Sequence, residues 1–290
     1  MNKITVKQEV KDTIASATPK TSISKSVQKI LDKECKVSDG YKVYTTKNYD
    51  IFNRLMGNRD VTSVNRIVES IKKIGYVDNP IIVNEKLEIV DGQNRLEAFR
   101  ILGYEVPFHI VEGIGINEAR QMNIGRGNWK PIDWVKSYAE TGNKNYIDLL
   151  NFWDMTHFDI SLLIQISKGL ISHTSISAKD YNNGTYEMSK EEKTLLTNTL
   201  PWLLKIKPII DSMTGNKRLR YMAFAFCYNV KGVDRKRLQT IIERDYFNII
   251  PYPDAENYLK EISKWYNKGL KTTTPLRFDY IYLSNGNLTE

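Results

Sequence analysis

Residues 81–111 contain a corner where an apolar, alternating run changes directly into a helical pattern, and Gly92, Gln93, Asn94 and Arg95 form that corner. An Asp-Gly pair usually marks a hairpin turn, but no strand follows this one. The amides at a helix N-terminus lack partners, and a glycine there lets an anion approach the backbone. We therefore predict that these four residues surround phosphate, with the Arg95 guanidinium gripping it. A tight turn in which Arg95 pairs with a carboxylate is the alternative.

Two further short segments bring an arginine together with glycine or asparagine. The segment 57–60 supplies Arg59 ahead of a helical pattern, and the segment 122–129 supplies Asn123 and Arg126 among glycines. A guanidinium group binds phosphate oxygens in a fixed fork. We predict that Arg59 and Arg126 add positive charge to the same pocket.

Two acidic residues stand beside these predicted phosphate contacts and raise the question of catalysis. Asp91 and Asp60 could form an acid/base or metal-binding pair, although short acidic side chains more often cap turns and helices. Asp91 is the candidate catalytic residue. The chain has three histidines and two cysteines, without the spacing of a zinc site or a disulfide framework.

The elements that would position this corner form a compact α+β unit. Apolar residues alternate where strands are expected and recur at helical spacing where helices are expected, with Gly75 and Gly103 as helix ends. In chain order the pattern predicts strand 41–46, helix 62–75, strands 79–83 and 87–90, helix 95–102 and strand 106–111.

The sequence pattern differs on either side of this unit. Residues 1–40 are basic and are expected to be a loosely held arm, residues 41–130 form the α+β domain, and residues 131–290 form a larger helical domain. A lone strand or extended tail is expected within 274–283. The predicted helices of the second domain are 133–140, 145–154, 159–169, 189–213, 217–230, 234–246 and 255–268.

Three boxes in this order resemble the N-terminal domain of the ParB/sulfiredoxin superfamily, found in chromosome- and plasmid-partition proteins and in many phage-borne relatives. "GNR" is similar to the family's Gln-Pro-Arg box, "DGQNRLEA" to its Gly-Glu-Arg-Arg-x-Arg-Ala box, and "MNIGR" to its Glu-Asn-Ile-Gln-Arg box. "NWKPIDW" then resembles the Asn-Pro-Ile-Glu stretch that opens the family's next helix. The resemblance covers about residues 43–140.

The resemblance implies a nucleoside triphosphate pocket, for CTP or ATP, with Mg²⁺ reached by Asn123. Two departures bear on this expectation. Met122 replaces the acidic residue that would sit beside Asn123, and Glu97 replaces an arginine. The sulfiredoxin branch is excluded because its reactive cysteine would fall at Gln93, which cannot act as a nucleophile.

Partner binding is expected in the helical half. Residues 146–169 could form a DNA-reading helix-turn-helix, but the apolar residues of its second helix favour simple core packing. A basic cluster further along is a better candidate for contacts with DNA phosphates, with a solvated cationic face as the alternative. The cluster consists of Lys217, Arg218, Arg220, Arg235, Lys236 and Arg237.

The composition agrees with a phosphate-bearing partner. The formal net charge is +8, and no apolar run or leader-like segment predicts membrane insertion or secretion, so a cytoplasmic setting is expected. The leading hypothesis is a ParB-like nucleotide-binding protein that acts with DNA. A metal-dependent nuclease or phosphotransferase on the same fold, and an inactive protein-binding adaptor, are the alternatives. The sequence leaves open whether the chain forms a homodimer.

Overall fold

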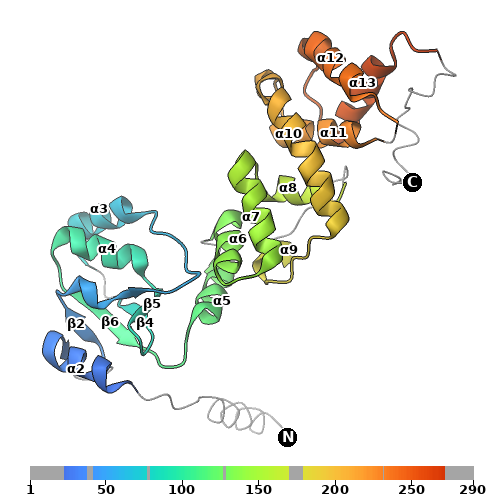
Figure 1. Cartoon of the computed structure of the whole chain (residues 1–290). Coiled ribbons are helices and arrows are strands. Elements are labelled where there is room, and N and C mark those ends of the chain that lie inside the picture. Colours follow the sequence, from blue (N-terminus) through green and yellow to red (C-terminus); the bar gives the residue numbers. More distant parts are fainter. Residues whose placement is uncertain are drawn as a thin grey trace, which may run out of the picture. The chain divides into compact units, whose positions relative to one another are not determined.

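The computed structural model describes residues 23–37, 42–76, 79–126, 129–169, 179–230 and 232–271. By internal contacts the chain divides into two compact units, Met1–Asp133 (unit 1) and Trp134–Glu290 (unit 2). Unit 1 contains a sheet with helices, and unit 2 is helical in its described part (Figure 1). This organisation confirms the predicted α+β fold class. The extended tail predicted within 274–283 lies outside the described residues.

The described strands of unit 1 form one mixed sheet in the order β1-β2-β6-β4-β5-β3. β4 runs parallel to β6, and β3 runs parallel to β5, whereas the other neighbours are antiparallel. Strand β3 is a short addition that the sequence pattern did not predict. The strands are β1 (Lys36–Val37), β2 (Tyr44–Thr46), β3 (Asn53–Arg54), β4 (Ile81–Val83), β5 (Glu88–Asp91) and β6 (Val106–Ile110).

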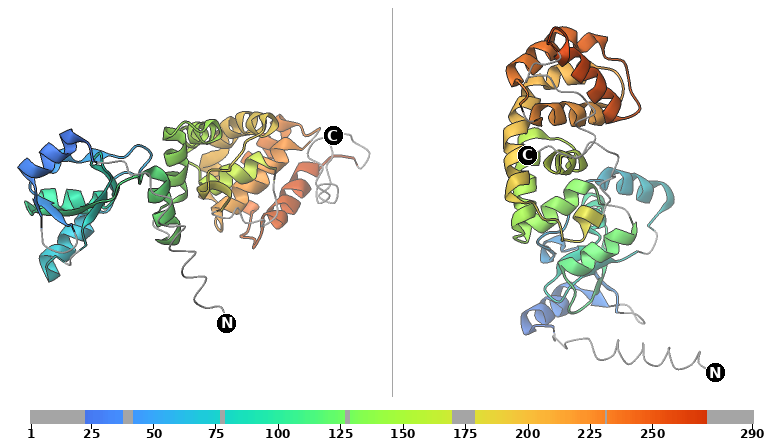
Figure 2. Two further views of the ribbon diagram at one scale, coloured as in Figure 1. Left: turned by 90° about the horizontal axis from the view of Figure 1, so that it is seen from below. Right: turned by 90° about the vertical axis from the view of Figure 1, so that its right-hand side faces the viewer.

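Each face of the sheet is covered by its own helices (Figures 1 and 2). Helices α3 (Val64–Ile74) and α4 (Gln93–Leu102) pack side by side and bury one apolar cluster with Ile81 and Ile89. Helix α5 (Ile116–Arg126) packs against β5 and covers the other face, where Ile82 and Val90 point. The alternation of strand residues between the two clusters follows from the two-residue period of a strand.

The N-terminal segment differs from the expectation of a loose arm over 1–40. Residues Lys25–Glu34 form helix α2, whose N-cap Ser24 accepts a hydrogen bond from the Val27 amide. Leu31 is only 3% exposed and joins the cluster beneath α3 and α4, and β1 then pairs with β2. The short apolar stripe of α2 is therefore part of the domain's core.

Unit 2 contains the helices that the periodicity predicts, with small shifts at their ends, and one short helix, α9, that it did not predict. Helix α10 begins with a capping box between Ser189 and Glu192. Helices α8, α10 and α11 pack against one another, and α13 packs against α11. The helices are α6 (Pro131–Glu140), α7 (Lys144–Thr156), α8 (Ile160–Ser167), α9 (Lys179–Asn182), α10 (Lys190–Ser212), α11 (Lys217–Asn229), α12 (Arg235–Asp245) and α13 (Ala255–Asn267), with 3₁₀ turns η1 (Tyr49–Ile51) in unit 1 and η2 (Tyr246–Asn248) here. Within the described part of the chain, no helix has the length and apolar character needed to span a bilayer.

Candidate functional site: the paired helix starts of unit 1

The strand-to-helix corner depends on Gly92. Strand β5 ends at Asp91, Gly92 is the N-cap of α4 with a φ of 107°, and the helix begins at Gln93. A Cβ atom at Gly92 would lie 2.6 Å from Cγ2 of Ile81 and 2.9 Å from Nη2 of Arg95. The glycine is therefore required by its left-handed backbone and by close packing. These two requirements explain how β5 runs directly into α4.

Arg95 and Asp91 are partners of each other. Nη2 of Arg95 lies 3.0 Å from Oδ2 of Asp91 and also donates to the carbonyl oxygen of Pro80 at 3.4 Å. Both side chains are only 20% exposed. This is the turn-stabilising ion pair that the sequence left as the alternative. The ion pair uses Nη2 of Arg95 and Oδ2 of Asp91, so these two atoms are already engaged within the turn.

The segment 57–60 is joined to the same corner, as the sequence predicted. Nε2 of Gln93 donates to Oδ1 of Asn58 at 3.2 Å, and Nδ2 of Asn58 donates to the carbonyl oxygens of Ile89 and Val90. Asn58 is 5% exposed, so its amide is a buried link between the loop and β5. Arg59 follows directly, with its backbone amide donating to Oδ1 of Asn58.

Asn94 connects the starts of the two helices. Its Oδ1 atom accepts hydrogen bonds from the backbone amides of Thr62 at 2.9 Å and Ser63 at 3.4 Å. Ser63 is the N-cap of α3 but makes no capping bond with its own side chain, and Gly92 cannot make one for α4. Two helix N-termini without a side-chain cap from their N-cap residue therefore begin next to each other.

A shallow depression lies at the start of α3. It encloses about 250 Å³ and is lined by residues 61–66, including Arg66. The side chain of Arg66 is exposed in the first turn of α3. Neither Arg66 nor Thr62 was among the site residues predicted from the sequence. The signal for Arg66 was its place three residues after Ser63, a typical N-cap residue.

The third predicted segment lies on the opposite face of the sheet from α3. Asn123 in α5 is 7% exposed, and its Nδ2 atom donates to the carbonyl oxygen of Ala119 at 2.7 Å. Met122 packs with Val90 in the apolar cluster there. Arg126 ends α5, and its side chain lies outside the described residues.

The surroundings of Asn123 do not fit a magnesium site. A single buried amide oxygen falls short of the several oxygen ligands that Mg²⁺ takes. In the described part of the chain, no three His, Cys, Asp or Glu residues are grouped closely enough to hold a metal ion.

Three members of the predicted DNA-binding cluster in unit 2 have structural partners instead. Arg220 is 2% exposed and donates from Nη1 to the carbonyl oxygen of Thr214. Nε of Arg218 donates to Oε1 of Gln165 at 3.0 Å. Arg237 donates to the carbonyl oxygens of Tyr266 and Lys268 at the end of α13, where a cation offsets the helix dipole. Arg220 is too buried to reach DNA, so its prediction as a contact is wrong.

The remaining three members, Lys217, Arg235 and Lys236, do not form one patch. Lys217 starts α11 and pairs with Asp211 at 2.8 Å, whereas Arg235 covers the ring of Tyr228 near the end of the same helix. Eleven residues of α-helix separate these positions by about 16 Å. The single basic cluster predicted from sequence is therefore split.

The helix-turn-helix candidate is excluded by burial. The turn between α7 and α8 is made by His157 with a φ of 52°, and α8 then enters the core of unit 2. All residues of α8 except Ser161 are buried, including Leu162, Leu163 and Ile166. A recognition helix must present side chains to the major groove, and α8 has no exposed face to present.

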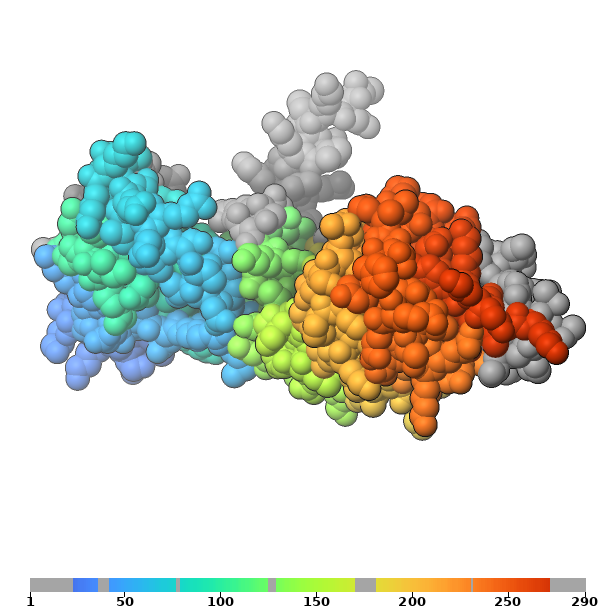
Figure 3. Space-filling view, turned by 90° about the horizontal axis from the view of Figure 1, so that it is seen from above, coloured from blue at the N-terminus to red at the C-terminus, as the bar shows by residue number. Residues whose placement is uncertain are grey.

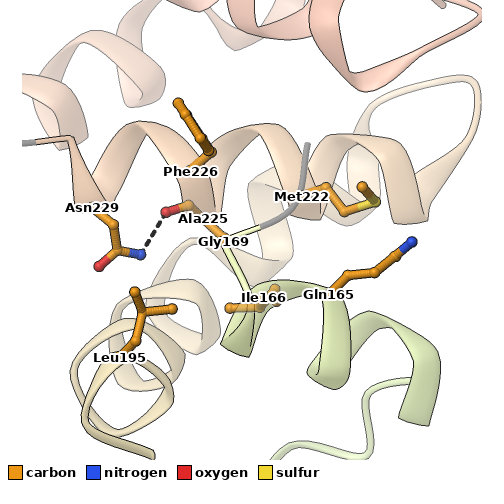
Figure 4. Close-up of a pocket in the computed structure, with 8 residues that line it drawn as sticks. All are labelled: Gln165, Ile166, Gly169, Leu195, Met222, Ala225, Phe226 and Asn229. Atoms are coloured by element: carbon orange, nitrogen blue, oxygen red, sulfur yellow. Dashed lines mark hydrogen bonds between the residues drawn. The ribbon is translucent and has the colours of Figure 1, made fainter. Parts of the chain in front are cut away.

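A small crevice lies between α8, α10 and α11 (Figure 4). It is lined by apolar side chains such as Ile166, Leu195 and Met222, and the amide of Asn229 at its edge donates to the carbonyl oxygen of Ala225. Its volume of about 10 Å³ has room for roughly one water molecule. It is a packing feature rather than a ligand site.

A scan against models of known protein families finds no match to this chain, and a search of curated proteins finds no related one. The resemblance to the ParB/sulfiredoxin superfamily therefore stays a prediction from the three boxes.

Proposed function

We propose that unit 1 binds the phosphate groups of a nucleoside triphosphate, CTP or ATP, at the paired starts of α3 and α4, and that the chain acts with DNA. The observation that carries this proposal is the pair of hydrogen bonds from the Thr62 and Ser63 amides to Asn94. They hold two helix N-termini together, and each N-terminus favours negative charge.

The charges around the depression support a phosphate ligand. Arg66 lines it, and Arg59 stands at the end of the segment that Asn58 ties to the corner. Arg95 remains paired with Asp91, so the proposal assigns the role of phosphate-binding cation to Arg66 instead. Guanidinium groups suit this role because they bind phosphate oxygens in pairs.

The size of the depression limits what it holds. A volume of about 250 Å³ is below the usual range for pockets that enclose a whole small molecule. It suits the phosphates of a nucleotide, with the base resting outside. We therefore expect inorganic triphosphate to compete with CTP and ATP for this site.

Isothermal titration calorimetry tests the proposal. CTP, ATP, GTP and inorganic triphosphate are titrated into the chain with and without Mg²⁺. Arg66→Gln is expected to weaken binding at least about fivefold, because it removes a charge-assisted contact of roughly 1 kcal/mol or more. Lys72→Gln, the same charge change in the last turn of α3, is the control and should bind as the wild type does. Equal losses of affinity in both variants would show that net charge alone accounts for the effect.

A nuclease or phosphotransferase gains no support from Asp91, which is committed to Arg95. Incubating the chain with plasmid DNA and Mg²⁺ or Mn²⁺ distinguishes a nuclease from a binding protein. Cleavage that disappears in Asp91→Ala would favour the enzyme over the binding protein.

A further inference from the structure

Three side chains from three helices form a stack in unit 2. The ring of Trp202 in α10 lies parallel to the ring of Tyr228 in α11, with centroids 4.6 Å apart and planes at 24°. On Tyr228 also lies the guanidinium of Arg235, with its Cζ atom 4.5 Å from the ring centroid. Trp202 is 8% exposed, so the inner layer of the stack is anchored in the core while Arg235 is exposed.

Two lysines stand beside this stack. Nζ of Lys205 donates to Oε1 of Gln239 in α12 at 3.2 Å. Gln239 is four residues after Arg235 and three after Lys236, so these positions share one face of α12. Lys205 is likewise three residues after Trp202 on α10. Together these contacts link α10 to α11, α11 to α12, and α12 back to α10. The three helices lie in the same part of unit 2 (Figure 1).

The two carboxylates of α12 and its N-cap that lie near these residues accept hydrogen bonds from amide groups. Asp234 caps α12 by accepting hydrogen bonds from the amides of Lys236 and Arg237. Glu243 accepts a hydrogen bond from Gln239 at 2.7 Å. In the described residues, neither Lys205, Arg235 nor Lys236 has an ion pair within 4.0 Å. The three side chains are exposed, and none of these charges is neutralised by a direct ion pair with a described residue.

We propose that Lys205, Arg235 and Lys236 form a contact surface for the phosphate backbone of nucleic acid. The inference deepens the proposed action with DNA and rests on that part of the proposed function. It adds Lys205, which the sequence did not single out, and it replaces the cluster that included the buried Arg220. Residues of α10 to α13, coloured from yellow-orange to red, lie at the surface of unit 2 in the view of Figure 3.

Stacking gives Arg235 a fixed role. Its Nε atom donates to the carbonyl oxygen of Tyr228 at 3.3 Å, and the ring beneath holds the guanidinium plane. A phosphate meets a cation whose side-chain freedom is already reduced, so less entropy is lost on contact. Lys205 and Lys236 act as point charges that add affinity without reading bases.

The position of nearby apolar groups favours nucleic acid over a lipid surface. The exposed Phe247 and Ile250 follow the C-terminal end of α12. Arg235 starts that helix, about 18 Å away along its axis. A membrane-binding helix carries its apolar and basic residues along one length, and α12 separates them.

Fluorescence anisotropy with a labelled 30-base-pair duplex, and with a single strand of the same length, tests the surface at several salt concentrations. The variant is Lys205→Gln/Arg235→Gln/Lys236→Gln. Its control, Lys144→Gln/Lys190→Gln/Lys264→Gln, makes the same charge change at other exposed sites of unit 2. We expect the variant to bind at least about tenfold more weakly. The slope of log K against log salt should fall by up to about 2.7 for the duplex, at about 0.9 per lost phosphate contact.

Each outcome decides the proposal. A loss of affinity in the Lys205/Arg235/Lys236 variant alone supports it. The nucleic acid that binds more tightly, duplex or single strand, is then the form that the surface recognises. Equal loss in the control, no loss in the variant, or no nucleic-acid binding by the wild type overturns it. Binding to anionic vesicles that the same variant abolishes, without nucleic-acid binding, would also overturn it. Calorimetry with CTP and ATP on these variants reports on unit 1 independently, so failure of this surface is distinguishable from failure of the nucleotide site.

Discussion

The side-chain oxygen of Asn94 lies 2.9 Å from the backbone nitrogen of Thr62, although the two residues are 32 positions apart in sequence. This hydrogen bond, together with the longer one from the Ser63 amide, ties the start of α4 to the residues that lead into α3. Asn94 is 8% exposed whereas Thr62 is exposed, so this hydrogen bond lies at the boundary between the core and the solvent. The arrangement of the proposed phosphate site follows from this link.

Asn94→Ala should destabilise unit 1 by about 1–2 kcal/mol, because the Thr62 and Ser63 amides lose their acceptor. Asn94→Asp keeps an acceptor oxygen and places negative charge at two helix N-termini, so it should retain most of the wild-type stability. Urea unfolding measures both. Equal losses of stability in Asn94→Ala and Asn94→Asp would contradict this role of the Asn94 side-chain oxygen.

Gly92→Ala should cost about 2–4 kcal/mol, since the new methyl group meets a left-handed backbone and the side chain of Ile81. Gly103→Ala is the matched control. Gly103 has a φ of 67° with open space around its Cβ position, so only the backbone penalty of about 1 kcal/mol applies. Thermal and urea unfolding compare the two, and a smaller loss at Gly92 than at Gly103 would exclude the close packing.

Asp211 should make the stability of unit 2 depend on pH. Burial opposes its charge, but hydrogen bonds from Lys207, Lys217 and Tyr221 outweigh this and lower its pKa to about 2. A lowered folded-state pKa stabilises the fold above the unfolded value of about 4, and this contribution is lost as the pH falls toward 2. Asp211→Asn should therefore cost about 1 kcal/mol at pH 6, after allowance for solvent screening, and almost nothing near pH 2. Asp154→Asn controls for the loss of one negative charge. A stability difference between Asp211→Asn and the wild type that stays constant with pH would contradict the lowered pKa of Asp211 as its cause.

Tyr228 should matter for nucleic-acid binding through its ring. Tyr228→Phe keeps the surface beneath Arg235 and should bind the duplex as the wild type does. Tyr228→Leu removes the cation–π contact, worth about 0.5–1 kcal/mol at an exposed site, and should weaken binding about two- to fivefold. Anisotropy measures affinity, and circular dichroism verifies that both variants are folded. Identical affinities for Phe and Leu would show that stacking plays no part.

Much of the fold was predictable because it depends on local patterns. The helices of unit 2 carry apolar stripes and polar caps, and the glycines at 75, 92 and 103 stand where the backbone needs a positive φ. Helix α2 and strand β3 were missed because each is short and obtains its stability from tertiary contacts. A single turn of apolar residues such as Val27, Ile30 and Leu31 does not show whether a core lies beneath it.

The candidate site was predictable only in outline. The sequence correctly brought the segments around Arg59 and Gly92 together, and it offered two partners for Arg95, a phosphate or a carboxylate. The structure shows the carboxylate, that of Asp91, and the phosphate stays a prediction. The burial of Arg220 depends on a tertiary environment that no local pattern reveals. Charge counts identify basic residues, whereas burial and partners decide which of them can meet a ligand.

Amide-resolved NMR with inorganic triphosphate reports on the very backbone groups that we propose bind phosphate. We expect saturable shifts of the Val64, Asn65, Arg66 and Gln93 amides, with little change at the C-terminal ends of α3 and α4. Shifts confined to other parts of the folded chain, or no shifts at millimolar ligand, would contradict it.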